Sequence, residues 1–454
     1  MTTQPEGLLV AWYGDDFTGA AAVMEVLAFA GVPTMLFLDT PTKAQLSRYS
    51  TLRAIGIAST ARAQSPDWMD KNLAPAFKSL LDLNPQLFHY KVCSTLDSSP
   101  TIGSIGRAIE IAADIIKPDI VPVLVAAPQM RRYQMFGHLF AGHEDNVYRI
   151  DRHPVMARHP VTPMTESDVA QHICAQSERL EMSVWSYENI GNQWTQAPAT
   201  QPSRILTVTM DCVDDRSEAA AGSLIWQSRA RNRLVVGSQG IEFALVRHWV
   251  ETGALSEQSP PGSAGCANGM VTVSGSVSPT TADQIAWSRS NGFTTIRFDP
   301  TQVCGDKSAL EAEITRAVDA SLLAISNGTD PLIFTAEGPD DLAIARFNAA
   351  VEGVNKSVAM VNEGVGIALG TVLERILTRS KIRRAVISGG DSSGYATRQL
   401  GIFALSALAP TIPGASLFKA HADAPMDGLE LALKGGQMGS PDYFGWIRDG
   451  GGVR

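Results

Sequence analysis

Short apolar runs alternate with amphipathic stretches along nearly the whole chain. In its first half, runs rich in β-branched residues predict strands at 8–13, 34–38, 53–58, 88–93, 120–126, 205–210 and 234–237. Between them, apolar residues recur at helical spacing and predict helices at 20–30, 67–81, 105–116, 166–180 and 217–230. This alternation is typical of right-handed βαβ units, in which helices cover both faces of a mostly parallel sheet.

The alternation is interrupted once, at 251–269 (ETGALSEQSPPGSAGCANG), where Gly, Pro, Ser and Ala dominate without periodicity, as in a linker. It then restarts, with strands predicted at 270–274, 294–298, 332–335, 385–387 and 429–433. Helices are predicted at 281–291, 308–323, 340–350, 364–377 and 394–407. A chain of 454 residues also exceeds what one core usually holds. We therefore predict two α/β domains, 1–255 and 270–454, each a largely parallel sheet flanked by helices, with a cleft between them.

Charge and composition narrow the class of protein. A net charge of −9 argues against a nucleic-acid partner, which would require a basic face. No apolar stretch reaches the roughly 18 residues of a membrane span, and the first residues do not resemble a signal peptide. Five scattered cysteines without a CxxC pair are typical of reduced thiols. We expect a cytoplasmic enzyme with a small-molecule substrate and no membrane partner. The sequence leaves open whether the protein forms a homo-oligomer.

An acidic turn, GDDFTGA at 14–20, lies where a strand should pass into a helix. In open α/β sheets this is where ligands bind. Asp15 and Asp16 end the strand, and Thr18 opens a helix whose free N–H groups suit an anion. We expect one aspartate to be the helix N-cap and the other to act on a substrate hydroxyl.

A second cluster follows the strand predicted at 88–93. It brings Lys91, then Ser94 and further hydroxyl residues, to a helix expected to start near Gly103. Lysine and hydroxyls at a helix N-terminus suit a small carboxylate or phosphate. Ordinary capping and turn formation explain the same residues equally well.

A cationic stretch begins at Arg131 and Arg132 and continues around two His-Pro pairs between 149 and 159. Basic residues gathered in an acidic protein suit an anionic substrate or the phosphoryl group in transfer. A solvated loop is the alternative for any single residue. The histidines lack the spacing of a metal site.

The second half contains three small-residue turns that would let the backbone approach phosphates. They are SGSVSPT at 274–280, GGDSSG at 389–394 and KGGQMG at 434–439. Asp391 is the candidate Mg²⁺ ligand among them. No Gly-Lys pair exists, which excludes a GxxxxGK[ST] loop. A GxGxxxG at 364–370 is a weak dinucleotide signal that helix packing also explains. The candidate nucleotide-binding residues are Ser274, Ser276, Gly389, Gly390, Asp391, Ser392, Gly435 and Gly436.

Taken in order, these motifs resemble the four-carbon acid sugar kinase family. The matching stretches are GDDFTGA (14–20), YKVCSTLDSSP (90–100), RHPVTPM (158–164), GSQGIEFAL (237–245), VSGSVSPTT (273–281), SGGDSSG (388–394) and LKGGQMG (433–439). The resemblance implies an N-terminal acid-sugar-binding domain and a C-terminal ATP-binding domain. It also implies phosphorylation of threonate, erythronate or a 3-oxo-tetronate.

Carried over by position, the resemblance assigns Asp15, Asp16, Thr18 and the 91–94 loop to the substrate. It assigns Ser276, 389–392 and Gly436 to ATP. Many members of the family read KxDSTLRG where this chain has Cys93 and Asp97 in place of the Asp and the Arg. Loss of that cation predicts a different acid, or a substrate carboxylate moved to Arg131 or Arg132.

The predicted reaction is ATP–Mg²⁺-dependent phosphorylation of a sugar-acid hydroxyl, with domain closure that excludes water. Asp16 is the candidate base or orienting group, and Lys91 with the helix N-terminus after Pro100 would hold the carboxylate. Asp391 would hold Mg²⁺ or act as the base instead. Two rivals remain: an NAD-dependent dehydrogenase of small hydroxy acids, and a non-enzymatic two-lobed ligand-binding protein.

Overall fold

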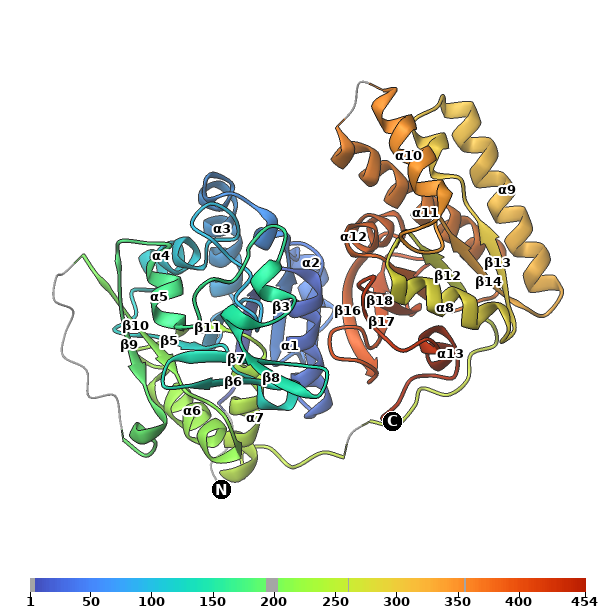
Figure 1. Ribbon diagram of the computed structural model, residues 1–454. Helices are drawn as coiled ribbons and strands as arrows, with labels where there is room; N and C mark the ends of the chain where they lie inside the picture. Colours follow the sequence, from blue (N-terminus) through green and yellow to red (C-terminus); the bar gives the residue numbers. More distant parts are fainter. Residues whose placement is uncertain (1–4, 193–202, 260, 355–356) are drawn as a thin grey trace. The chain divides into compact units, whose positions relative to one another are not determined.

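The computed structural model describes residues 5–192, 203–259, 261–354 and 357–454, without the side chains at 359 and 390–393. The chain divides into two compact units, Met1–Ser259 and Pro260–Arg454 (Figure 1). Each unit contains a sheet flanked by helices, as the alternation predicted. Within the described part of the chain, no helix combines the length and apolar character needed to span a bilayer.

The sheet of the first unit is parallel and has the strand order β2-β3-β1-β4-β11-β5-β10-β9. Its central strands are buried along their whole length, which explains their continuous apolar runs. The strands are β1 (Val10–Gly14), β2 (Thr34–Phe37), β3 (Ala54–Ala58), β4 (Leu87–Lys91), β5 (Val121–Leu124), β9 (Leu180–Trp185), β10 (Ile205–Met210) and β11 (Leu234–Gly237).

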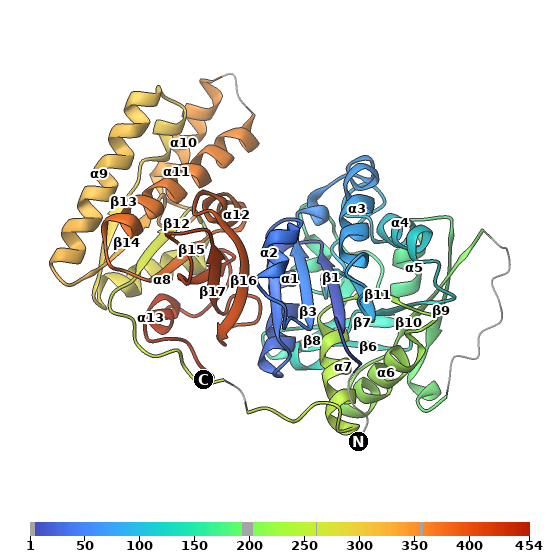
Figure 2. The ribbon, with the colours of Figure 1, turned by 180° about the vertical axis from the view of Figure 1, so that it is seen from behind.

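Helices of the first unit pack beside one another in two groups on this sheet (Figures 1 and 2). One group is α1 (Phe17–Phe29), α6 (Asp215–Ser228) and α7 (Gly240–Glu251). The other is α3 (Pro66–Leu81), α4 (Ile105–Ile116) and α5 (Val169–Cys174). A short helix, α2 (Lys43–Ser47), follows β2.

Two segments of the first unit differ from the prediction. The helix expected at 166–180 is only the six-residue α5, because the chain continues into β9, which pairs along its length with β10. The cationic stretch contains an antiparallel three-stranded sheet, β6 (Arg132–Met135), β7 (His138–His143) and β8 (Asn146–Arg149). The buried carboxylate of Asp211 binds the β6–β7 turn by accepting from the backbone N–H groups of Phe136 and Gly137, at 2.6 and 2.9 Å.

The sheet of the second unit has the order β13-β14-β12-β15-β18-β17-β16. Strands β12 to β15 and β18 pair in parallel, and β17 pairs antiparallel with β18 and β16. The strands are β12 (Val271–Ser274), β13 (Phe293–Arg297), β14 (Asp330–Phe334), β15 (Arg384–Ser388), β16 (Ile402–Ala409), β17 (Leu417–Ala422) and β18 (Glu430–Lys434). The helices are α8 (Pro279–Arg289), α9 (Lys307–Ser326), α10 (Leu342–Glu352), α11 (Val358–Arg379), α12 (Gly390–Gln399) and α13 (Tyr443–Arg448).

The helix predicted at 394–407 is wrong in its second half, where the structure has β16. Helix α12 ends at Gln399, and Gly401 follows with a φ of +63°, a left-handed conformation that glycine adopts without strain. The residues beyond it pair with β17, which the prediction also lacked. Antiparallel pairing, a tertiary interaction, decided this segment.

Candidate active site

Strands β1 and β4 bring the first two motifs together. They are parallel neighbours in a register that pairs Gly14 with Lys91. The backbone N–H of Asp15 donates to the carbonyl of Lys91 at 3.0 Å. The acidic turn and the Lys91 loop, separated by about 75 positions in the sequence, therefore leave the sheet side by side at its carboxyl edge.

Asp16 is the N-cap of α1, since its Oδ1 accepts from the backbone N–H of Gly19 at 3.0 Å. Asp15 is the more buried of the two, with 4% of its side chain exposed against 26% for Asp16. The expected division into one capping and one functional aspartate therefore gives the capping role to Asp16, the candidate base. That role leaves its carboxylate partly open to a ligand.

Arg62 is a residue that the sequence did not single out. Its Nη2 donates to Asp15 Oδ1 at 2.8 Å and to Asp16 Oδ1 at 2.6 Å, and its Nε donates to Asp15 Oδ2 at 3.1 Å. It lies in a one-turn 3₁₀ helix, Ala61–Ala63, after β3. No motif marks this position, because only the adjacency of β3 and β1 brings Arg62 to the turn.

The pKa values of Asp15 and Asp16 are shifted in opposite directions. Burial would raise the pKa of Asp16, but Arg62, Lys91 and the Gly19 N–H outweigh it and lower that pKa. Burial raises the pKa of Asp15 in spite of Arg62. Two carboxyl groups that share one cation commonly separate in this way. Asp16 is therefore the more acidic of the two carboxyl groups, which suits it to orient a hydroxyl.

The Lys91 loop is largely buried. Lys91 is 1% exposed, and its Nζ approaches Gly19 so closely that a Cβ there would stand 2.2 Å away. Ser94 is buried and Thr18 is half-buried. In the same loop, Cys93 Sγ and Thr95 Oγ1 are 2.9 Å apart. Lys91 therefore contacts the acidic turn that contains Thr18.

The expected anion site at the start of α4 is occupied by the protein itself. Gln176 Oε1 accepts from the N–H groups of Ile105 and Gly106, at 2.7 and 3.2 Å. Ser104 Oγ caps the same turn by accepting from Arg107 N at 3.1 Å. This helix start is closed by side chains, so the idea that it holds the substrate carboxylate is wrong.

The two arginines at the start of β6 point to different surroundings. Arg131 is exposed and donates to the carbonyls of Glu144 and Asn146 in the β7–β8 turn. Arg132 is half-buried and lies near Cys93, and its buried Nε has no partner among the described residues. Of the two, Arg132 is the one placed beside the Lys91 loop.

In the second unit, one carbonyl joins two of the glycine turns. The Gly436 oxygen accepts from Ser278 Oγ, from Thr281 Oγ1 at 2.9 Å and from Lys434 Nζ at 3.5 Å. Ser274 and Ser276 are both buried in the turn after β12. A Cβ on Gly436 would stand 2.4 Å from Ser276 Oγ, so a larger residue here would displace the Ser276 hydroxyl.

Lys434 is a second residue that the predicted site did not include, although it precedes the third turn. It is 2% exposed, and its Nζ also donates to the Gly435 carbonyl at 3.0 Å and to Thr281 Oγ1 at 3.3 Å. These hydrogen-bond partners are neutral oxygens, and burial lowers the pKa of Lys434 to about 8. A buried cation at the carboxyl edge of a parallel sheet suits a phosphate site.

The turn at 389–392 joins β15 to α12. Gly389 is the N-cap of α12, with a φ of +138° that few other residues adopt, and its N–H donates to the Lys434 carbonyl at 2.9 Å. A glycine at this position offers no capping side chain to the helix N-terminus. The side chains of Asp391 and Ser392, and the surroundings of Gly390, lie outside the described residues.

The GxGxxxG segment lies inside α11, not at a strand-to-helix turn. A Cβ on Gly370 would stand 2.8 Å from the Ala396 backbone in α12. Close helix packing accounts for this glycine. A dinucleotide fingerprint would instead open a helix directly after a strand.

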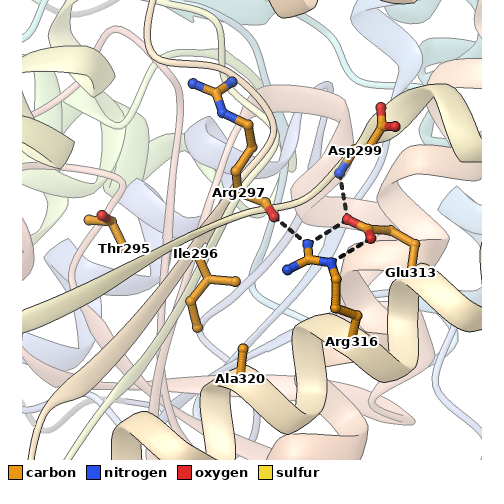
Figure 3. A pocket seen from close by; sticks show the side chains of 7 residues that line it. All are labelled: Thr295, Ile296, Arg297, Asp299, Glu313, Arg316 and Ala320. Atoms are coloured by element: carbon orange, nitrogen blue, oxygen red, sulfur yellow. Dashed lines mark hydrogen bonds and ion pairs between the residues drawn. The ribbon is translucent and has the colours of Figure 1, made fainter.

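A surface hollow of about 520 Å³ lies between β13 and α9 (Figure 3). Two arginines line it. One of them, Arg316, donates to the Glu313 carboxylate and to the carbonyl of Arg297. Arg297 is itself paired with Asp341 at 2.7 Å. These charges neutralise one another, so the hollow has no cation left for a phosphate. The lining residues are Thr295, Ile296, Arg297, Asp299, Glu313, Arg316 and Ala320.

Comparison with known proteins assigns a domain family to each half of the chain. Residues 10–245 match the model of a sugar-binding N-terminal domain, and residues 271–444 match that of a nucleotide-binding C-terminal domain. A 3-oxo-isoapionate kinase of Paraburkholderia graminis is 41% identical over 451 residues, covering 99% of this chain and 96% of that protein. A 3-oxo-tetronate kinase of Pseudomonas savastanoi pv. phaseolicola is 28% identical and covers 96% of each chain. One of Cupriavidus necator is 27% identical over 96% of this chain and 95% of that protein.

Solved structures share the fold. A Salmonella typhimurium LT2 protein superposes with a TM-score of 0.75 at 23% identity, covering 97% of this chain and 98% of that one. A Haemophilus influenzae protein of the DUF1537 family has a TM-score of 0.73 at 20% identity, over 96% and 99% of the two chains. At these identities the likeness shows the architecture alone.

Proposed function

Because the chain belongs to the four-carbon acid sugar kinase family and is a sugar acid kinase, we propose that it phosphorylates a 3-oxo sugar acid, with 3-oxo-isoapionate as the first candidate. The observation that carries this choice is the 41% identity to a 3-oxo-isoapionate kinase over 99% of the chain. The relatives named as 3-oxo-tetronate kinases are 24–28% identical. ATP is the phosphate donor, in agreement with the nucleotide-binding match to the second half.

On the substrate side, Asp16 accepts the hydrogen of the hydroxyl that is phosphorylated and aligns its oxygen. The lowered pKa of Asp16 supports orientation over strong proton abstraction, and phosphoryl transfer requires mainly alignment and charge neutralisation. Lys91 and Arg132 supply positive charge for the anionic end of the acid. Thr18 and Ser94 bind further hydroxyls, and Asp15 positions Arg62. Arg131, whose guanidinium donates to the carbonyls of Glu144 and Asn146, is given no role in this proposal.

On the nucleotide side, the turns at 274–276, 389–392 and 435–436 hold the phosphates. The tight approach of Gly436 to Ser276 and the glycine cap of α12 support this assignment.

The substrate hydroxyl oxygen forms a bond to the γ-phosphorus while the bond from that phosphorus to the ADP oxygen breaks. The hydroxyl proton leaves toward Asp16 or solvent. Asp391 is the proposed ligand of Mg²⁺, which would neutralise charge on the β- and γ-phosphates.

Metal binding in this proposal rests on one carboxylate. Among the described residues there is no group of three His, Cys, Asp or Glu that could hold a metal. A nucleotide-bound Mg²⁺ needs only one or two protein carboxylates, because phosphates and water complete its shell. The single aspartate in the turn at 389–392, Asp391, fits that requirement.

ADP release tests the proposal. The purified chain is incubated with ATP–Mg²⁺ and, in turn, with 3-oxo-isoapionate, 3-oxo-tetronate, threonate and erythronate. We expect the highest kcat/KM with 3-oxo-isoapionate and a product heavier by one phosphoryl group. Absence of ADP release with all four acids, from protein that binds ADP, would contradict it. Asp16→Asn should lower turnover by about 10²-fold or more; a loss below tenfold would remove Asp16 from the reaction.

A further inference from the structure

The loop after β4 carries a carboxyl group with an unsatisfied oxygen. Asp97 is half-buried, and its Oδ1 is shielded from solvent and has no hydrogen-bond partner among the described residues. Buried acceptors in folded proteins are nearly always paired, and the exceptions often mark sites that a ligand or water completes. Asp97 therefore retains acceptor capacity that the protein itself leaves unused.

The loop keeps its shape without Asp97. Ser98 Oγ donates to the Leu96 carbonyl at 2.9 Å and is itself bound by His172 Nε2 and Gln176 Nε2, each at 2.9 Å. Leu96, wholly buried, holds a φ of +57°, which is costly for a leucine and needs such fixation. The side chain that hydrogen-bonds to the Asp97 carboxyl is that of Cys93. A structural role for Asp97 in this loop has little support.

Asp97 faces the same charged cluster as the acidic turn. Its carboxyl group interacts electrostatically with Arg62, His159 and Asp16. Arg62 is already bound by Asp15 and Asp16, so it does not satisfy Asp97. His159 accepts from the Thr162 N–H through Nδ1 at 3.1 Å, which places the ring proton of a neutral His159 on Nε2.

The charge of Asp97 identifies the group that it binds. A carboxylate repels the carboxylate of a sugar acid, whereas it accepts strongly from a hydroxyl. Rotation about the Cβ–Cγ bond, which is soft in aspartate, brings either oxygen to the accessible side of the group. We propose that Asp97 binds a hydroxyl of the sugar acid, other than the one phosphorylated, and thereby sets which polyhydroxy acid the enzyme prefers. This inference rests on the proposed function.

Two variants and a set of substrate analogues test it. Asp97→Ala removes the acceptor, whereas Asp97→Asn keeps an oxygen acceptor in the same place. Both are assayed with 3-oxo-isoapionate and with analogues in which one hydroxyl at a time is replaced by hydrogen. We expect Asp97→Ala to raise KM for the full substrate by about 10- to 100-fold with little change in kcat. We expect no further loss with the one analogue that lacks the bound hydroxyl, and a loss below about fivefold for Asp97→Asn.

Thermal unfolding separates binding from structure. Removing a half-buried carboxyl group that has one unsatisfied oxygen should leave the Tm of the ligand-free chain unchanged or raise it. A fall of several degrees in Asp97→Ala, or an equal loss with every analogue, would overturn the inference while leaving the kinase activity established. If the wild-type chain phosphorylates no sugar acid, the proposed function fails instead.

Discussion

Lys91 Nζ lies directly against Gly19, at a distance where a Cβ on residue 19 would come within 2.2 Å of it. The same Cβ would stand 2.5 Å from Asp16 Oδ1. Glycine at the first turn of α1 therefore allows a buried ammonium and a capping carboxylate to share one small space. Lys91, at the end of β4, thus contacts the helix that follows β1, in addition to the backbone pairing of the two strands.

Gly19→Ala should separate stability from activity. Alanine in a helix normally stabilises by about 0.5–1 kcal/mol relative to glycine. The atoms that it would displace are the mobile ends of Lys91 and Asp16, so the fold should tolerate it. We expect an unfolding free energy within about 1 kcal/mol of wild type, and a kcat/KM lower by about 10². Gly262→Ala, where a Cβ meets nothing within 4 Å, is the matched control. Full activity in Gly19→Ala would show that the Lys91 position is not required.

Arg62→Met should destabilise the first unit in a pH-dependent way. It leaves the carboxyl groups of Asp15 and Asp16 without their shared cation, which costs about 3 kcal/mol at neutral pH. The lowered pKa of Asp16 contributes stability above its unfolded pKa near 4, and that contribution is lost as the pH falls through the lower folded value. The difference between wild type and variant should therefore be largest near pH 7 and shrink below about pH 4.

Urea unfolding from pH 3 to pH 7 measures this difference. Arg179→Met is the control, because Arg179 forms an exposed ion pair with Asp114 and should cost no more than about 1 kcal/mol. A destabilisation of Arg62→Met that is equal at every pH would mean that Arg62 acts by packing and not by its charge.

Lys434→Met should change how stability depends on alkaline pH. Burial lowers the pKa of Lys434 to about 8, whereas an unfolded lysine titrates near 10.5. Between these values the unfolded chain holds a proton that the folded chain lacks, so raising the pH stabilises the folded state. Wild type should gain up to about 3 kcal/mol relative to Lys434→Met between pH 7 and 10.5. Chemical denaturation at both pH values measures it, and a constant difference would show that Lys434 is not neutralised there.

The local pattern of residues was enough to predict much of this protein. The alternation of buried β-branched runs with helical stretches led to two α/β domains, and parallel strands such as β10 and β11 have the predicted bounds. Glycine turns after strands led to the predicted positions for phosphates and hydroxyls, because backbone conformation and small side chains are local properties. The motifs, taken in order, also indicated the family.

Tertiary contacts decided the rest. Segment 402–409 is a strand because β17 pairs with it, so the helical spacing that predicted a helix up to residue 407 was misleading. The strand at 180–185, which pairs with β10, was not predicted. Arg62 reaches Asp15 and Asp16 through the adjacency of β3 and β1, and Gln176 closes the start of α4 from 71 residues away. The sequence by itself determined most of the helices and strands and the kinds of side chain that each turn carries. Only the fold decided which charges meet, because Coulomb and hydrogen-bond energies depend on distance in space and not on separation along the chain.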